Sequence, residues 1–141
     1  VQYPRETLLG KTGNCADLAA LYLSSLESVG IATAFIVLPG HVIPLFEAPE
    51  QVRAQVLEYQ GKRWIPIEVT LLNQGFSQAW KAAFDVLKNS RSSRFMTTLE
   101  ATYKHPPFSF ESPASLEPNL NLGVWEELLK KEAGNTAAIL Q

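Results

Sequence analysis

Cysteine and histidine are scarce in this chain, which has one cysteine and two histidines among 141 residues. A single cysteine cannot form an internal disulfide, so a disulfide-stapled fold is excluded, while the redox compartment stays open. The longest apolar run, around Ile31 to Leu38, is far too short to span a bilayer, and no basic and then apolar signal segment opens the chain. We therefore expect no membrane insertion.

A surplus of basic residues is also missing. Lysine and arginine number 12 against 14 acidic residues, and no basic stripe alternates with aromatic side chains, so we expect no nucleic-acid partner. Apolar residues make up 46% of the sequence, which at this length predicts one domain over residues 1–141 with a true core. The chain begins at Val1 without a methionine and enters a motif almost at once, so we expect a fragment of a longer protein.

The first part of the chain predicts a loop followed by a helix. Residues 1–13 are broken by proline and glycine, which indicates a loop with at most one turn of helix. Asn14 is a plausible N-cap, Asp17 suits the first turn, and Gly30 is a plausible stop, so the predicted helix covers residues 15–29. Its inward face is expected to carry Cys15, Leu18, Tyr22, Leu26 and Val29.

A small antiparallel meander is predicted next. Short runs rich in β-branched and aromatic residues occupy 31–38, 41–47, 51–59 and 63–70, with a Pro39-Gly40 turn after the first and a tight hairpin near Gly61. Pro44 and Pro66 indicate sheet edges or bulges, because proline lacks the N–H of a ladder bond. In the last run Glu68 shares a face with Trp64, which predicts a half-shielded carboxylate on a strand.

The second half, residues 74–141, predicts covering helices and a loop around the core of residues 1–73. Ser77 could cap a helix with Phe76, Trp80, Phe84 and Leu87 at helical spacing. Residues 94–103 fit a helix or a strand equally well. Residues 105–123 contain too many prolines for either and predict a long loop, and residues 124–134 predict a short helix ending at Gly134.

Three residues could together support thiol chemistry. The unpaired N–H groups and positive dipole of a helix N-terminus favour a thiolate, and Cys15 has this position. His41 opens a strand directly after a turn, where it can act as a base, and Glu68 on a neighbouring strand could accept the far ring N–H of His41. Taken singly, each residue has a simpler reading: a core cysteine, a solvated loop histidine, and a strand glutamate facing water.

The order of these residues resembles the transglutaminase-like superfamily, of bacterial type. The matching stretches are PRETLLGKTGNCADLAALYLSSLESVGI, then LPGHVIPLFE, then RWIPIEVT, which span roughly residues 2–73. The resemblance implies an α+β fold with a papain/transglutaminase-like core, in which an N-terminal nucleophile helix packs on a small antiparallel sheet. Residues after the core match nothing as specific.

The resemblance implies a role for each residue of the site. Cys15 would be the nucleophile, His41 the general base and acid, and Glu68 the residue that orients the imidazole. The third member is more often aspartate in that family, so the longer Glu68 could sit differently. Asp17, Asn14 and Trp64 are implied structural supports, and Gln2 or Tyr3 would supply a second oxyanion donor beside the Cys15 N–H. His105, in the proline-rich stretch, is a rival to His41.

The sequence leaves three hypotheses for the function of this chain. The first is a thiol acyl-transfer enzyme, a protease, an amidase or a transglutaminase, which needs no cofactor and acts on an amide group of a peptide or protein. The second is a catalytically silent module of the same fold that binds a peptide, a partner or flanking domains of a longer chain. The third is a metal site from Cys15, His41, Glu68 and Asp17, although no ligand pair has the close spacing typical of metal sites. The resemblance favours an extracytoplasmic location and leaves the compartment open.

Overall fold

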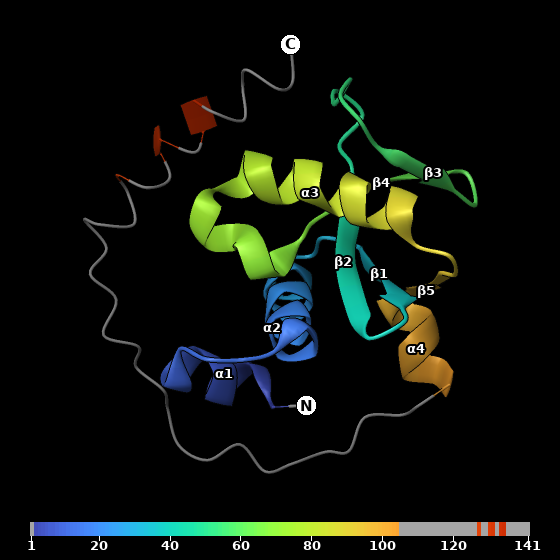
Figure 1. Cartoon of the computed structure of the whole chain (residues 1–141). Helices are drawn as coiled ribbons and strands as arrows, with labels where there is room; N and C mark the ends of the chain where they lie inside the picture. Colours follow the sequence, from blue (N-terminus) through green and yellow to red (C-terminus); the bar gives the residue numbers. More distant parts are fainter. Residues whose placement is uncertain (1, 105–126, 128–129, 132, 135–141) are drawn as a thin grey trace.

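The computed structural model describes residues 2–104, 127, 130–131 and 133–134. Figure 1 shows a mixed α/β arrangement in which helices pack around a curled antiparallel sheet. The elements follow in the order α1 (Pro4–Gly10), α2 (Cys15–Ser28), β1 (Thr33–Leu38), β2 (His41–Glu47), β3 (Leu57–Tyr59), β4 (Lys62–Pro66), the 3-10 helix η1 (Val69–Gln74), α3 (Phe76–Asn89), β5 (Arg94–Thr97) and α4 (Thr98–Lys104).

The prediction of a loop before α2 is wrong, because the chain forms helix α1 over Pro4–Gly10. Proline suits the first position of a helix, where its missing N–H would be unpaired in any case, and α1 packs against α2. Helix α2 itself begins at Cys15 as predicted and ends one residue early, at Ser28. The local capping signals therefore located α2. Helix α1 carries local signals of its own, since Pro4 is at its first position and the Glu6 carboxylate accepts the Tyr3 N–H at 3.1 Å.

The inward face of α2 differs in part from the predicted stripe. Ala19 and Leu23 are its most buried apolar residues, while Val29 is 71% exposed because it follows the last helical turn. Tyr22 packs against the core, and burial raises the pKa of its phenol to about 12. The helix therefore faces the sheet through residues around 19 and 23.

The sheet has the strand order β3-β4-β2-β1-β5, and every neighbouring pair is antiparallel. The hairpin near Gly61 is confirmed: Gln60 and Gly61 have φ of 51° and 74°, the left-handed pair that a tight β-hairpin requires. A simple meander is not observed, because β4 rather than β3 lies beside β2. Strand β2 therefore neighbours the strand that leads into Glu68.

Pro44 and Pro66 do not mark edge strands, because β2 and β4 both have a neighbour on each side. The Pro44 carbonyl accepts the Ile67 N–H at 3.0 Å, but proline has no N–H to return a bond, and the β2–β4 ladder ends at Leu45 and Pro66. The chain then leaves the sheet and enters η1. Pro44 thus helps to place Glu68 at the start of η1 rather than on a strand.

Two buried clusters fill the spaces on the two sides of the sheet. In the first, Ala19 of α2 packs with Ile67 and Val69. In the second, Ala83 of α3 packs with residues of the central strands, including Ile43. Because side chains alternate along a strand, β2 contributes Val42 to the first cluster and Ile43 to the second.

Helix α3 begins at Phe76 after Gly75, so the predicted cap at Ser77 is wrong: the Ala79 N–H bonds to the Gly75 carbonyl at 3.1 Å. The ambiguous segment 94–103 contains both alternatives in turn, strand β5 and then helix α4. The predicted proline-rich loop at 105–123 lies outside the described residues. Residues 127, 130–131 and 133–134 are helical where the sequence predicts the final short helix.

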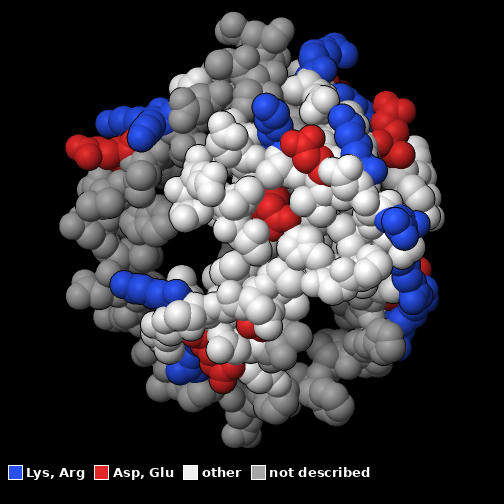
Figure 2. All heavy atoms as spheres, in the orientation of Figure 1, with Lys and Arg blue, Asp and Glu red and all other residues white. Residues whose placement is uncertain are grey.

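Charge is distributed without a dominant sign on the face shown in Figure 2, where both signs are scattered and much of the centre is uncharged. Among the described helices, none has the length and apolar character needed to cross a membrane.

Candidate active site

The N-terminus of α2 holds Cys15 in a fully capped turn. The Asn14 side-chain oxygen accepts the N–H groups of Ala16 at 2.9 Å and Asp17 at 3.0 Å, and Asp17 accepts the Asn14 N–H at 2.9 Å in return. Cys15 is the first helical residue and is partly exposed. Its own N–H has no partner within the described chain, so it is available to stabilise an oxyanion at the positive end of the helix.

Asp17 ties the start of the chain to this turn. It is 4% exposed, and its second oxygen accepts the Gln2 N–H at 2.6 Å. The backbone hydrogen bonds from Asn14 and Gln2 hold the pKa of Asp17 below its usual range, against the opposing effect of desolvation. A Cβ at Gly13 would lie 2.9 Å from the Asp17 Cβ, so glycine permits this close approach. These contacts match the structural role expected for Asp17.

The two candidate oxyanion donors differ in their placement. Gln2 is bonded through its backbone to Asp17, in the first turn of α2, and its side-chain oxygen accepts a weak bond from Thr7 at 3.4 Å. Tyr3 precedes α1 and is 54% exposed. Its backbone N–H donates to the Glu6 carboxylate at 3.1 Å. The contact with Asp17 brings Gln2 next to the first turn of α2.

His41 and Glu68 form the central contact of the site. His41 is the first residue of β2, and its Nε2 lies 2.6 Å from the Oε2 of Glu68, as the sequence predicts for this pair. The side chains are 23% and 5% exposed. Glu68 is not on a strand as predicted, since it caps η1, where its Oε1 accepts the Thr70 hydroxyl at 2.6 Å and the Thr70 N–H at 3.2 Å. Both carboxylate oxygens are therefore held in place.

These hydrogen bonds determine the charge state of Glu68. Burial acts to raise its pKa, but the Thr70 hydroxyl, the His41 ring, the Thr70 N–H and the attraction to His41 together outweigh burial and lower it. Glu68 is thus a carboxylate at neutral pH, and a carboxylate can only accept hydrogen bonds. In neutral His41 the proton must then be on Nε2, which leaves Nδ1 with a free lone pair.

Trp64, expected beside Glu68, packs mainly into the second cluster. It is 2% exposed and lies in the second cluster, where its ring meets Phe95 edge-on at 5.5 Å. The Lys62 ammonium lies 5.9 Å from the ring centre. Glu68, four residues later, is instead fixed through its backbone N–H, which donates to the Ala79 carbonyl at 2.9 Å. Trp64 therefore supports the sheet.

Cys15 begins the helix that packs beside the His41–Glu68 pair, and among the described residues it has no bond to either member. Helix α2 packs against both β2 and η1, and Leu18, one turn after Cys15, lies in the same cluster as Val42 and Val69, the residues that follow the pair. No hydrogen bond joins the thiol to His41 in the described part of the chain. The structure therefore joins His41 to Glu68 and shows no bond from either of them to the Cys15 thiol among the described residues.

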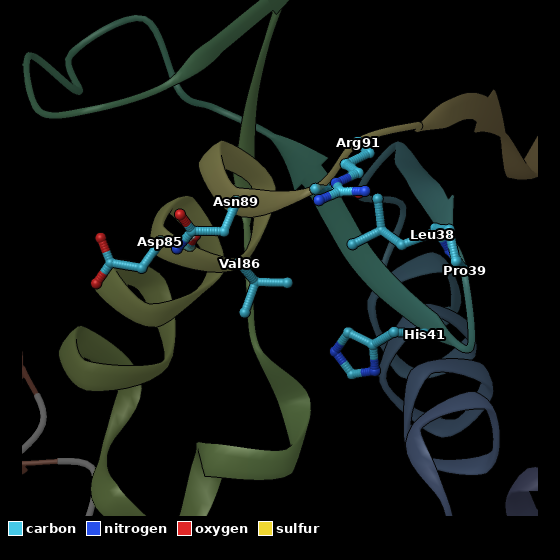
Figure 3. Close-up of a pocket in the computed structure, with 8 residues that line it drawn as sticks. Leu38, Pro39, His41, Asp85, Val86, Asn89 and Arg91 are labelled. Atoms are coloured by element: carbon cyan, nitrogen blue, oxygen red, sulfur yellow. The ribbon is translucent and has the colours of Figure 1, made fainter.

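His41 also lines a surface pocket of about 630 Å³ between the end of β1 and the C-terminal half of α3. In Figure 3 the His41 ring and the Val86 side chain point into the space that separates the two elements. Residues of α3 and the turn after it were not expected at the site, because nothing local in the sequence relates them to His41. Thr70 was not singled out either, although it lies only two residues after the acid whose carboxylate it contacts.

Comparisons with protein-family models, curated proteins and solved structures gave no match. The transglutaminase-like resemblance thus rests on the three sequence stretches alone. Across the described residues, no three histidine, cysteine, aspartate or glutamate side chains gather as a set that could hold a metal ion. The rival histidine, His105, lies outside the described residues.

Proposed function

We propose that this chain is a transglutaminase-like thiol domain with a papain-type core, and that it cleaves or transfers amide groups of a peptide or protein with Cys15, His41 and Glu68. The observation that carries the proposal is the 2.6 Å contact between His41 Nε2 and a buried carboxylate. The buried Glu68 carboxylate accepts three hydrogen bonds, one of them from the His41 ring. A general base needs such a fixed partner to hold its ring in one orientation.

Each residue then has a chemical task. Glu68 holds the proton of His41 on Nε2, so Nδ1 can take the proton of the Cys15 thiol. The thiolate attacks the carbonyl carbon of an amide, and the amine leaves with the proton that His41 had taken. Water then hydrolyses the thioester and restores the thiol. The Cys15 N–H, and Gln2 beside it, would stabilise the oxyanion of each tetrahedral intermediate.

The test is the rate of Cys15 alkylation by iodoacetamide as a function of pH. Cys15 is the single cysteine of the chain, so the labelled site is unambiguous. We expect His41→Ala to slow alkylation near pH 6.5 by about tenfold or more, because the imidazole no longer draws the thiol proton. Glu47→Ala, at the other end of the same strand, is the matched control and should leave the rate unchanged.

The proposal fails if the His41→Ala protein reacts at the parent rate, or if Cys15 reacts only in the unfolded chain. Circular dichroism of each variant would show that the fold is retained. A parent protein with a strongly His41-dependent thiol would justify a search for amide substrates.

A second candidate is a binding module that keeps the fold without the reaction. The absence of a hydrogen bond between the Cys15 thiol and His41 in the described chain favours it. Hydrogen bonds of thiol sites often tighten only with substrate bound, which is why we place the enzyme first. A thiol indifferent to His41, in a protein that still binds peptide, would make the binding module the better description.

A further inference from the structure

The pocket beside His41 has one apolar wall and one cationic side chain. Leu38 and Pro39 form the wall at the end of β1, and Val86 of α3 faces them. Arg91, in the turn after α3, lies over Leu38 in the view of Figure 3. A volume of about 630 Å³ is in the range of pockets that hold a small molecule or one peptide residue.

The other polar groups of the pocket are already occupied or point elsewhere. Asn89 donates to the Asp85 carbonyl at 2.9 Å, and the Ser90 hydroxyl donates to the Ser92 carbonyl at 2.8 Å. In Figure 3 the Asp85 carboxylate points away from His41. Arg91 makes no ion pair or side-chain hydrogen bond with any other described residue. Among the described residues that line the pocket, the Arg91 guanidinium is therefore open to a ligand together with the His41 ring, and the guanidinium matches the fork of a carboxylate.

We propose that this pocket binds the C-terminal residue of a peptide substrate, with Arg91 on the free carboxylate and an aliphatic side chain against Leu38 and Val86. The inference rests on the proposed function, since His41 lies at the same pocket and would protonate the amine of that residue as it leaves. Cleavage forms the Cys15 thioester and releases one amino acid, and water then hydrolyses the thioester to the shortened peptide and the thiol.

The test uses two probes that differ only in the group that Arg91 would contact. N-acetyl-leucine carries a carboxylate, and N-acetyl-leucinamide carries a neutral amide of the same shape. Binding is followed through the imidazole signals of His41 in proton NMR, assigned by comparison with His41→Ala. The variants are Arg91→Gln and, as a matched control, Lys88→Gln, which removes the same charge from α3 at a position that does not line the pocket.

We expect N-acetyl-leucine to bind about fivefold more tightly than its amide, as a charge-assisted pair near the surface allows. Arg91→Gln should abolish this preference, and Lys88→Gln should keep it. Equal binding of the two probes, a preference that survives Arg91→Gln, or a His41 signal that neither probe moves would each overturn the assignment.

The outcome separates this inference from the proposed function. A His41-dependent Cys15 thiol without a preference for the carboxylate would reject the pocket assignment alone. A carboxylate preference that depends on Arg91, in a protein whose thiol ignores His41, would keep the pocket as a binding site and reject the thiol chemistry.

Discussion

Strand β2 makes an acid–base pair at each of its ends, and the two pairs differ in almost every physical respect. At its start, His41 contacts Glu68 at 2.6 Å with side chains 23% and 5% exposed. At its end, Glu47 contacts Lys62 at 3.1 Å with side chains 38% and 52% exposed. The first carboxylate also accepts two bonds from Thr70, whereas Glu47 has the lysine as its recorded partner. The comparison shows that the two pairs differ through burial and extra hydrogen bonds rather than through charge, since both join an acidic and a basic side chain.

The largest expected effect is on removal of the buried carboxylate. Glu68→Ala should lower the free energy of unfolding at pH 7 by about 3 kcal/mol, because His41 and Thr70 both lose a buried partner. Urea denaturation at fixed ionic strength measures it. A loss no larger than that of Glu47→Ala would remove the distinction between the two ends of β2.

Acidic pH should remove the contribution of the Glu68 carboxylate to the free energy of unfolding. Its pKa is lower in the folded chain than the ordinary value of 4.5, so the unfolded chain binds more protons in this range. The stability from Glu68 is therefore complete above pH 4.5 and is lost as the pH falls through the folded pKa. The difference in unfolding free energy between the parent and Glu68→Gln should shrink accordingly. A difference that grows with acidity would contradict the lowered pKa.

The cap of α2 should matter less than Glu68 but should affect the same end of the molecule. Asn14→Ala removes the acceptor of two N–H groups next to Cys15, and loss of such a cap costs about 1 kcal/mol. Thermal unfolding measures the loss of stability. Asn14→Asp, which retains an acceptor, should recover most of it, and an unchanged midpoint for Asn14→Ala would show that the cap contributes nothing.

The smallest effect should be at the far end of β2. Lys62→Met should change the free energy of unfolding by less than about 0.5 kcal/mol, and added salt should weaken the pair further because both side chains are exposed. A double-mutant cycle with Glu47→Gln isolates the pair from the packing of Lys62 over Trp64. A coupling as large as that of His41 with Glu68 would contradict the comparison.

Local sequence signals were enough to predict several helices, strands and turns. The start of α2 follows from the Asn14 cap, because the cap acts within three residues, and the bounds of β2 follow from a turn on one side and a break on the other. The hairpin at Gln60 and Gly61 also follows from its own backbone angles. Helix α1 was misjudged although Pro4 at its first position and the Glu6 carboxylate on the Tyr3 N–H are local signals, and the start of α3 was misjudged because a backbone carbonyl rather than a side chain caps it.

The sequence by itself determined which residues could do thiol chemistry: a lone cysteine at a capped helix start, a histidine after a turn, and an acid beyond it. Only the tertiary structure decided how they are held. The placement of β4 beside β2, and the end of their ladder at Leu45 and Pro66, bring Glu68 onto His41 across 27 positions of chain. The pocket on the other side of His41 depends on the packing of α3. Such long-range contacts leave no local pattern, because they are selected by burial of a shared core rather than by neighbouring residues.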